Sequence, residues 1–382
     1  MTNAKGAALA EVPVRGALPD VAVQDLARLT ERLDHAFSGM AGSDLLITGG
    51  AGFLGYYLVL APLAWNRANP SQEPIRVTVH DNFLRGVPRW LSDLDDGALR
   101  LVERDVLAPL PADEPRFDHI IHAASIASPI YYRKHPIETM DANVEGLRLL
   151  LDHAAERADT DTPVRGLLFF STSEIYGDPD AANIPTPETY HGNVSCTGPR
   201  ACYDESKRYG ETLCVNFARQ SGVPVTIARP FNNYGPGLRI DDRRVLPDFA
   251  RDVLAGRDIV MLSDGSATRT FCYVMDAVDG YYRILTAGRP GESYNIGTDR
   301  PEISMQELAE RVTAIGSRLT GYAGSVVVGT SDDPEYLTDN PNRRCPVIDK
   351  ARTELDYTPE VELDDGLERA LRWYLAEQEA SS

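Results

Sequence analysis

Tyr203 and Lys207 stand four residues apart in the segment Cys202 to Lys207. Positions i and i+4 of an α-helix share a face, so the Lys207 ammonium is expected to lie beside the Tyr203 phenol. A neighbouring positive charge favours the phenolate and lowers the pKa of a phenol from its ordinary value of about 10. The spacing therefore predicts that Tyr203 acts as a base, which takes a proton from a sugar hydroxyl.

A glycine-rich turn, Thr48 to Gly55, opens the globular part of the chain. It follows a predicted buried strand and leads into a predicted apolar helix, Phe53 to Leu60. Glycines at three-residue spacing allow a tight turn and close approach of the backbone to a pyrophosphate, which the helix N-terminus favours. With the Tyr/Lys pair, the turn indicates a nicotinamide redox enzyme. The residues assigned to the cofactor here are Gly49, Gly52, Phe53, Leu54, Gly55, Tyr203 and Lys207.

An acidic residue follows the next predicted strand, Ile75 to His80. Asp81 is placed there to bind the ribose diol of an adenosine and to repel a 2'-phosphate, which favours NAD over NADP. The nearby Arg85 weakens this argument, and a plain turn at Asp81 and Asn82 is the alternative. The remaining residues assigned to the cofactor follow predicted strands, and they are Asn82, Asp105, Val106 and Ala123.

Polar residues end another apolar strand, where Thr172, Ser173 and Glu174 follow Ser171. Ligands of an open parallel sheet bind beyond the carboxyl ends of its strands, so reactive side chains are expected at this point. Thr172 is placed to hold the substrate hydroxyl for Tyr203. Ser173 and Glu174 then remain for a second chemical step.

With these motifs the chain resembles the extended short-chain dehydrogenases/reductases that act on nucleotide sugars, and most of all the UDP-glucuronic acid decarboxylases, which form UDP-xylose. The glycine turn and the Tyr/Lys pair identify only the superfamily. The Thr-Ser-Glu trio, the Gly-Pro-Arg run and Arg269 favour the decarboxylases. The similarity runs from about residue 44 to 370, in the segments 122–129, 172–179, 198–205, 231–236 and 268–271.

The resemblance implies a carboxy-lyase with tightly bound NAD. Tyr203 removes the C4 hydroxyl proton as hydride passes to NAD, and the resulting 4-keto acid loses carbon dioxide. The enolate is then protonated at C5, and C4 is reduced again. Glu174 and Ser173 are expected near C5 and C6. Arg269 is expected to hold the carboxylate or to govern protonation, and its alternative is a surface ion pair.

Other functions on the same scaffold stay open. The 4,6-dehydratases carry Asp where this chain has Ser173, and the C4 epimerases usually carry a small or hydroxyl residue in place of Glu174. A nucleotide-sugar epimerase or 4,6-dehydratase is therefore the alternative, and a non-catalytic dinucleotide sensor is the least favoured. Whether the product leaves as a pentose or as a 4-keto pentose is also open.

The substrate, which the resemblance implies is UDP-glucuronate, is expected to meet four side chains. Arg200, Asn232 and Arg244 are placed to meet a diphosphate. Tyr273 either stacks near the uracil or packs in the interior. Departures from the family pattern at residues 233–238 and 261–263 leave the nucleotide base and the sugar open.

Apolar runs alternate with helical patterns over most of the chain. This alternation predicts an α/β fold, a doubly wound parallel Rossmann sheet with a smaller C-terminal substrate-binding lobe. We expect an N-terminal extension (1–43), an NAD-binding domain (44–231) whose sheet is completed by part of 270–300, and a lobe formed mainly by 232–382. The predicted strands are Asp44 to Thr48, Ile75 to His80, Leu99 to Glu103, His119 to Ala123, Gly166 to Ser171 and Val225 to Ala228.

Two helical regions bear on assembly. Val21 to Phe37 shows amphipathic spacing, which suits either a dimer arm or a cover that packs on the core, and packing is favoured. The resemblance suggests a homodimer, with Asn143 to His153 and Tyr203 to Gln220 as the candidate interface helices.

Composition excludes several classes of function. The chain has 57 acidic and 38 basic residues and a formal net charge of -19, which argues against binding to nucleic acid or to an anionic membrane. Its five cysteines are scattered and predict free thiols, and no metal site is expected. Neither a leader pattern nor a long apolar run is present, so we expect a soluble, cytoplasmic protein.

Overall fold

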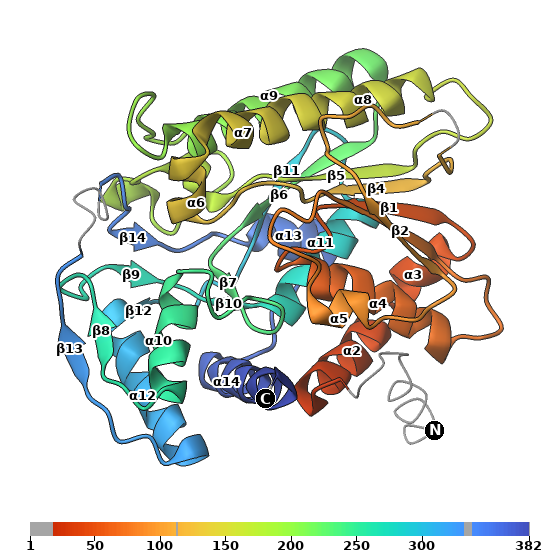
Figure 1. The fold of residues 1–382 in the computed structure, drawn as a ribbon. Helices are drawn as coiled ribbons and strands as arrows, with labels where there is room; N and C mark the ends of the chain where they lie inside the picture. The colour runs from red at the N-terminus through yellow and green to blue at the C-terminus, as the bar shows by residue number, and fades with distance from the viewer. Residues whose placement is uncertain (1–17, 112–113, 332–337, 382) are drawn as a thin grey trace.

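The computed structural model describes residues 18–111, 114–331 and 338–381. Its centre is a seven-stranded parallel sheet (Figure 1), which confirms the predicted fold class. In spatial order its strands are β11 (Ser293–Ile296), β6 (Val225–Pro230), β5 (Gly166–Phe170), β4 (His119–His122), β1 (Asp44–Thr48), β2 (Arg76–Asp81) and β3 (Leu99–Glu103).

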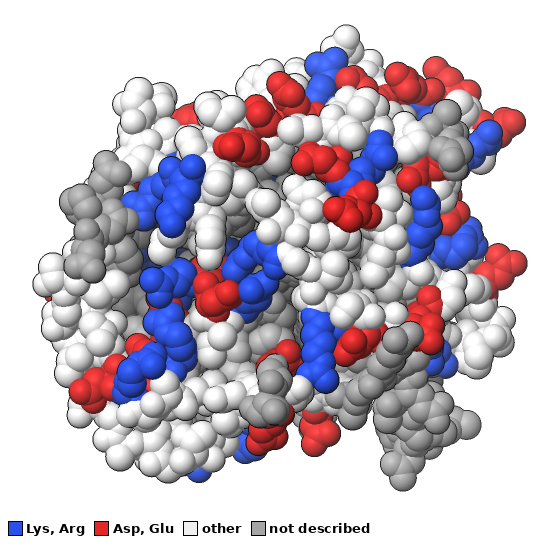
Figure 2. All heavy atoms as spheres, viewed as in Figure 1, with Lys and Arg blue, Asp and Glu red and all other residues white. Residues whose placement is uncertain are grey.

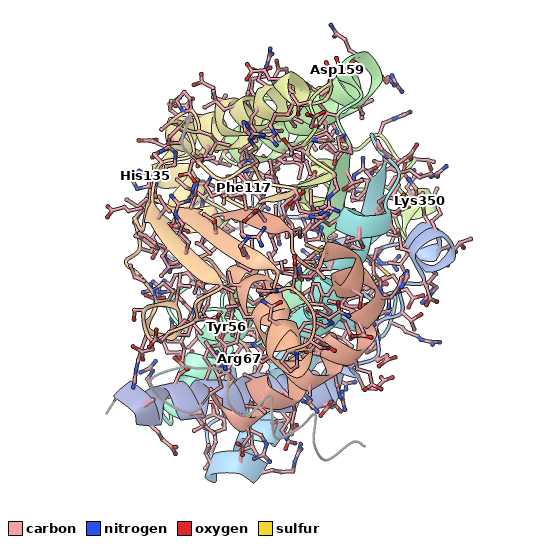
Figure 3. All side chains as sticks on the ribbon, turned by 90° about the vertical axis from the view of Figure 1, so that its right-hand side faces the viewer. Tyr56, Arg67, Phe117, His135, Asp159 and Lys350 are labelled. Carbon is pink, nitrogen blue, oxygen red and sulfur yellow. The ribbon has the colours of Figure 1, made fainter. Side chains whose placement is uncertain are left out.

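The sheet is buried on both faces because its strands are almost continuously apolar. Leu167 and Phe169 of β5 face the helices α8 (Leu147–Glu156) and α9 (Ala201–Ser221). The other face of the sheet packs on α4 (Gly55–Ala68) and α11 (Val274–Ala287). Figure 3 shows the same layers from the side, with Tyr56 and Arg67 of α4 below the strands. Among the described residues no helix has the length and apolarity needed to cross a membrane.

The register of the sheet brings separate motifs to one edge. Thr48 pairs with His80 of β2 and with His122 of β4, so these three strands end level with one another. The glycine turn, Asp81 and Ala123 follow directly after them. The predicted cofactor residues therefore meet at the carboxyl edge of the sheet, although long stretches of chain separate them.

The N-terminal region forms two helices, α2 (Asp20–Arg32) and α3 (Asp34–Met40), where the sequence predicted one. Leu26, Leu29 and Phe37 are fully buried in the same core as α4, α11 and α14 (Leu363–Ser381). The amphipathic face is thus covered within the subunit, as the packing alternative predicted. Residues 1–17 lie outside the described residues.

Buried ion pairs fasten these helices to the rest of the molecule. Asp25 accepts hydrogen bonds from Tyr57 Oη and Tyr273 Oη, both 2.6 Å, and pairs with Arg369 of α14 at 3.1 Å. Arg32 pairs with Asp276 and Asp279 of α11 at 2.8 Å, and Arg283 pairs with Asp279 at 3.0 Å. We name this group the seam cluster; it comprises Asp25, Arg32, Asp276, Asp279, Arg283 and Arg369.

The second half of the chain builds a lobe of small sheets and helices beside the carboxyl edge (Figure 1). Its strands are β7 (Asn233–Tyr234), β8 (Ile259–Met261), β9 (Thr268–Arg269), β10 (Cys272–Tyr273), β12 (Ile303–Ser304), β13 (Val326–Val328) and β14 (Arg343–Arg344), and its helices are α10 (Val245–Leu254) and α12 (Met305–Thr320). Helix α13 (Asp349–Leu355) packs against α11 and β11 of the main sheet. The division into the predicted domain boundaries stays a prediction.

Short helices complete the first half of the chain. They are α5 (Arg89–Ser92), α6 (Pro129–Lys134), α7 (Pro136–Asp141), the π-helix η1 (Ala142–Gly146) and the 3₁₀ helices η2 (Ser173–Tyr176) and η3 (Ala181–Asn183). Of these, α6 and η2 begin at the carboxyl edge, beside the cavity described next.

Candidate active site

A cavity of about 1480 Å³ lies between the carboxyl edge of the sheet and the lobe. Figure 2 shows a hollow in this face of the molecule with basic side chains gathered around it. Every residue that the sequence assigned to cofactor, substrate or catalysis lines the cavity, with the exception of Tyr273. The cavity is large enough for a dinucleotide and a nucleotide sugar to lie end to end.

The glycine turn is shaped by close backbone contacts. Gly49 has a φ of +72°, and a Cβ on it would lie 2.5 Å from the backbone of Ala124. A Cβ on Gly55 would lie 1.9 Å from the carbonyl oxygen of Gly50. Helix α4 begins at Gly55, two residues later than predicted, and the glycine turn before it lines the cavity, so the positive end of the helix dipole lies at the cavity wall. These features fit the pyrophosphate of a dinucleotide.

The Asp81 carboxylate joins the glycine turn to the following loop. Its oxygens accept hydrogen bonds from the backbone N–H of Ala51 at 3.0 Å and of Phe83 at 2.8 Å, and burial raises its pKa. Asn82 donates to Asp105 at 3.3 Å, which links the ends of β2 and β3. The turn alternative and the ribose site are therefore compatible.

Two ion pairs neutralise the charge of Arg85. This removes the argument that Arg85 weakens the preference for NAD over NADP. Its guanidinium pairs with Asp242 at 2.9 Å and with Asp241 at 3.2 Å. It also lies over the ring of Tyr131, 5.0 Å from the ring centroid. A guanidinium engaged in this way is not available to a 2'-phosphate, so the site fits NAD better than NADP.

Tyr203 and Lys207 share one face of α9, as predicted, and both are buried. The Lys207 ammonium donates to the carbonyl oxygen of Phe170 at 2.8 Å and lies 5.8 Å from the centroid of the Tyr203 ring. Burial lowers the pKa of Lys207 to about 7 and raises the pKa of Tyr203 to about 12. The predicted preference for phenolate is therefore not found in the protein by itself, because burial and the Glu174 carboxylate favour the neutral phenol.

Thr172 and Tyr132 are close neighbours of the Tyr203 side chain. Burial and Glu174 raise the pKa of Tyr203, and a hydrogen bond with Thr172 partly opposes them. Tyr132 stacks on Tyr203 with ring centroids 5.0 Å apart and an interplanar angle of 8°. Tyr132 was not predicted, and only a position in the short helix after a cavity-lining strand pointed to it.

Glu174 is clamped by two arginines. Its Oε1 and Oε2 accept from the two terminal nitrogens of Arg344, at 2.5 and 2.6 Å, and Oε2 also pairs with Arg200. Burial would raise the pKa of Glu174, but Arg200 and Arg344 outweigh it and hold this pKa at about 2. Glu174 is consequently ionised at every pH at which the protein is expected to work.

Arg344 was missed by the sequence analysis. It comes from β14, in the Pro- and Asn-rich segment 340–346. The only signal was a pair of arginines in a loop of an acidic chain, and that pattern is equally typical of a solvated turn. Arg200, which was expected at a diphosphate, is found on Glu174 instead.

Arg269 and Asp204 complete the same cluster. Arg269 is buried and donates to the carbonyl oxygens of Thr268 at 2.7 Å and Asn342 at 3.1 Å. Within the described residues it has no carboxylate partner, so the surface ion pair alternative is wrong. Burial and Arg344 lower its pKa to about 9. Burial and Glu174 raise the pKa of Asp204 to about 8.

The remaining predicted residues divide into two groups. Asn232 and Arg244 line the cavity, where Asn232 donates to the carbonyl of Thr270 at 2.9 Å and Arg244 pairs with Asp242 at 3.0 Å. Tyr273 lies outside the cavity, fully buried against Asp25 of α2. The stacking alternative for Tyr273 is contradicted, because its hydroxyl is engaged by the seam cluster.

His122 and Ser173 lie close to this chemistry. His122 Nδ1 is 2.8 Å from Thr48 Oγ1, and burial lowers the histidine pKa to about 3, so His122 is neutral and structural. Ser173 is buried at the cavity wall between Thr172 and Glu174. It is placed to contact the substrate rather than to carry charge.

The parallel sheet, the glycine turn and the Tyr/Lys pair define a dinucleotide-binding enzyme of the Rossmann type. The sequence matches the NAD dependent epimerase/dehydratase family over residues 45–297. The chain belongs to this family, which confirms the superfamily resemblance.

Named relatives show a group within this family to which the chain is similar. The chain is 38% identical over 327 residues to UDP-glucuronic acid decarboxylase 3 of Arabidopsis thaliana, which covers 85% of this chain and 86% of the relative. It is 34% identical over 342 residues to UDP-glucuronic acid decarboxylase 1 of Xenopus tropicalis, covering 88% of this chain and 73% of the relative. The predicted resemblance to this group is confirmed.

Solved structures share the fold across most of their length. Epimerase Mth375 from Methanothermobacter thermautotrophicus superimposes with a TM-score of 0.75 at 27% identity, covering 92% of this chain and 97% of that one. The dTDP-glucose 4,6-dehydratase DesIV from Streptomyces venezuelae, solved with NAD and TYD bound, gives a TM-score of 0.74 at 28% identity, covering 88% and 98%. The scaffold is therefore common to enzymes of different reaction types.

Proposed function

We propose that this chain is an NAD-dependent UDP-glucuronate decarboxylase, a carboxy-lyase that forms UDP-xylose. The observation that carries the proposal is the cluster beside Tyr203, in which Thr172, Ser173 and Glu174 line the cavity together with two buried arginines, Arg200 and Arg269, and the partly buried Arg344. Guanidiniums bind carboxylates in pairs of hydrogen bonds, so this part of the cavity suits a uronic acid. The decarboxylase relatives support the same function.

The first step is the oxidation of C4. To act as the base, Tyr203 must first lose its own proton, and the positive charge of a bound oxidised nicotinamide would favour this phenolate. The phenolate then takes the hydroxyl proton, and Thr172 orients that hydroxyl. NAD, held by the glycine turn and Asp81, supplies the chemistry of a hydride acceptor and later donor. The buried Lys207, with a pKa near 7, is placed to exchange a proton with its surroundings when Tyr203 changes its protonation state.

The second step is the loss of carbon dioxide. A carboxylate β to a ketone releases carbon dioxide when the electron pair of the breaking bond moves onto the ketone oxygen as an enolate. The surplus of guanidinium charge near Glu174 stabilises this anion. Arg269, whose pKa is lowered to about 9, is proposed to govern the protonation of C5 that follows.

The test is direct. Purified protein is incubated with UDP-glucuronate, and carbon dioxide and the nucleotide product are measured together. Carbon dioxide with a pentose nucleotide supports the proposal. A hexuronate product without carbon dioxide indicates an epimerase, and binding of NAD without any turnover indicates a sensor. The epimerase and dehydratase structures favour these alternatives only through the shared scaffold.

We also propose that the protein forms a homodimer through α7, η1 and α9. Ile137 and Met140 of α7 and Tyr209 of α9 are large apolar side chains that are 42–63% exposed. Helices α7 and α9 pack on one another, and large exposed apolar side chains on adjacent helices are typical of a protein interface. Replacement of Tyr209 by Glu is expected to convert a dimer into a monomer in size-exclusion chromatography with light scattering. An unchanged dimer mass would place the interface elsewhere.

The cytoplasm is the proposed location. All five cysteines are free, and Cys196 is exposed. Exposed thiols persist in a reducing compartment. Titration of the denatured protein, purified without reductant, is expected to find all of them as thiols.

A further inference from the structure

A loop of the lobe is fastened to the loops that follow two strands of the main sheet. It comprises residues 239–244, between β7 and α10, and we name it the strap. Asp242, Arg243 and Arg244 of the strap line the cavity, whereas Asp241 does not. The strap therefore forms cavity wall on one side and outer surface on the other.

Arg85 joins the strap to the loop that follows β2. Its guanidinium pairs with Asp242 at 2.9 Å and with Asp241 at 3.2 Å. In the opposite direction, Arg239 of the strap donates to the carbonyl oxygen of Arg85 at 3.0 Å and pairs with Asp241 at 2.9 Å. The two arginines are 154 positions apart in the chain. The loop after β2 and the strap thus hold each other through both side chains and backbone.

Ser128 joins the strap to the loop that follows β4. This serine is buried, and its hydroxyl donates to the carbonyl oxygen of Asp242 at 3.0 Å. Just before the strap, the chain also lies against the first turn of α4, where a Cβ on Gly237 would lie 2.4 Å from the Cβ of Tyr56. The strap is therefore held at several points around the glycine turn.

The order of the strands shows what lies beneath the strap. In the sheet β1 lies between β4 and β2, so the glycine turn after β1 lies between the loop after β4 and the loop after β2. The strap contacts both of these loops and must cross the space in front of the glycine turn. This space fits the pyrophosphate of a dinucleotide. A dinucleotide bound there is enclosed between the sheet and the strap.

We propose that Arg85 is a positioning residue that retains NAD by holding the strap closed over the cofactor. NAD leaves only after Arg85 has parted from Asp241 and Asp242 and the strap has moved away. The inference rests on the proposed function only through the bound NAD. It explains how a cofactor that is reduced and oxidised again in each cycle stays in place between cycles.

The experiment measures the exchange of bound NAD. Protein that carries NAD is mixed with an excess of isotope-labelled NAD, and the bound label is counted after filtration at successive times. Arg85→Ala is expected to raise the exchange rate by about tenfold at low ionic strength, through the loss of two partly exposed ion pairs. Arg85→Lys keeps the charge but not the fork that reaches both aspartates, and its rate should fall between the two.

Ionic strength gives a second readout. The side chains of Arg85 and Asp241 are 38% and 56% exposed, so dissolved salt screens their attraction. The exchange rate of the unsubstituted protein is therefore expected to rise with salt. The rate of Arg85→Ala should rise much less, because this variant has already lost the ion pairs that salt weakens.

Asp241→Asn separates the strap from a direct contact between Arg85 and NAD. Asp241 does not line the cavity, so its loss should not speed exchange if Arg85 binds NAD directly. The strap predicts that Asp241→Asn raises the exchange rate by about threefold, through the loss of one exposed ion pair. It also predicts that Asp241→Asn adds little when it is combined with Arg85→Ala.

Arg311→Ala is the matched control. Arg311 pairs with Asp364 at 2.7 Å and joins α12 to α14, away from the cavity. Its side chain is 37% exposed, which is close to the value for Arg85. This variant loses a similar ion pair and should exchange NAD at the rate of the unsubstituted protein. Circular dichroism and thermal unfolding at saturating NAD show that each variant is folded.

Three outcomes overturn the inference. An unchanged rate in Arg85→Ala would show that the strap does not retain NAD. A faster rate in Arg85→Ala with an unchanged rate in Asp241→Asn would assign Arg85 to a direct contact, and an equal increase in Arg311→Ala would indicate general loosening.

Failure of the proposed function gives a different result. If the unsubstituted protein releases no carbon dioxide from UDP-glucuronate while the exchange rates respond as expected, the proposed function fails and the inference stands. If carbon dioxide is released and the exchange rates of the variants are unchanged, only the inference fails.

Discussion

Arg200, Arg269 and Arg344 lie around Glu174, and we call this group the guanidinium cluster. The guanidinium cluster and the seam cluster are both networks of arginines and carboxylates, and they differ in the balance between positive and negative charges. In the seam cluster three aspartates face three arginines, and Asp276 also accepts from the backbone N–H groups of Glu360 and Val361. In the guanidinium cluster Arg200 and Arg344 pair with Glu174, whereas Arg269 has no carboxylate partner among the described residues. No residue of the seam cluster lines the cavity. A balanced network stabilises the fold, whereas an unbalanced one at a cavity is suited to bind an ion.

The largest effect is expected when the base beside the guanidinium cluster is removed. Tyr203→Phe is expected to lower kcat by about 10³–10⁴-fold, because general base catalysis contributes on this scale. The free energy of unfolding should change little. Steady-state turnover of UDP-glucuronate measures the loss. Tyr132→Phe, on the phenol that stacks on Tyr203, is the control, with a decrease within about tenfold; full turnover by Tyr203→Phe would exclude Tyr203 as the base.

The next effect concerns the seam cluster. Asp279→Asn is expected to lower the free energy of unfolding by about 3–5 kcal/mol, since it breaks a fully buried pairing and leaves Arg32 and Arg283 short of charge. Activity of the folded protein should be unchanged. Urea unfolding followed by fluorescence gives the value.

A matched control is available at the same arginine. Asp356 lies 3.7 Å from Arg283 but is almost fully exposed, so Asp356→Asn is expected to change the free energy of unfolding by less than about 1 kcal/mol. Similar losses in the two variants would show that burial and balance do not set the strength of the seam cluster.

The third prediction uses pH. Burial raises the pKa of Asp25 from 3.8 to about 6, so the folded state holds this proton more tightly than the unfolded chain. The corresponding stability is complete below about pH 4 and is lost as the pH rises through 6, by about 2–3 kcal/mol. At pH 5 about half of this contribution remains, so the difference in free energy of unfolding between pH 5 and pH 8 should be smaller by about 1.4 kcal/mol in Asp25→Asn. Parallel pH profiles of the two proteins would contradict the raised pKa.

The smallest expected effect is a change in the free energy of unfolding when the guanidinium cluster loses Glu174. Glu174→Gln removes the carboxylate that pairs with Arg200 and Arg344, yet it should lower the free energy of unfolding by only about 1 kcal/mol, because ions and water reach these arginines through the cavity. This loss in the free energy of unfolding should be larger at low ionic strength than in a buffer that contains chloride. A loss as large as that of Asp279→Asn would mean that both clusters serve the fold in the same way.

Sequence patterns located most of the fold and much of the site. Strands β1 and β3 begin and end where the apolar runs predicted, because local alternation and glycine turns are encoded within a few neighbouring residues. The contact of Arg344 with Glu174 joins residues 170 positions apart, and no local pattern records it. The pKa of Tyr203 was mispredicted for a related reason. The i+4 spacing shows which side chains share a face of a helix, but it does not show how deeply they are buried. The sequence could not decide between the two alternatives for Tyr273, because its partner, Asp25, lies 248 positions away.

Helices α2 and α14 lie side by side (Figure 1), and Asp25 of the first meets Arg369 of the second. A ribosome makes Arg369 344 residues after Asp25. During synthesis Asp25 therefore lacks Arg369 until nearly all of the residues that line the cavity have been made. The seam cluster is therefore complete only after α14 has been made, and a chain that ends before α14 leaves the buried Asp25 without Arg369.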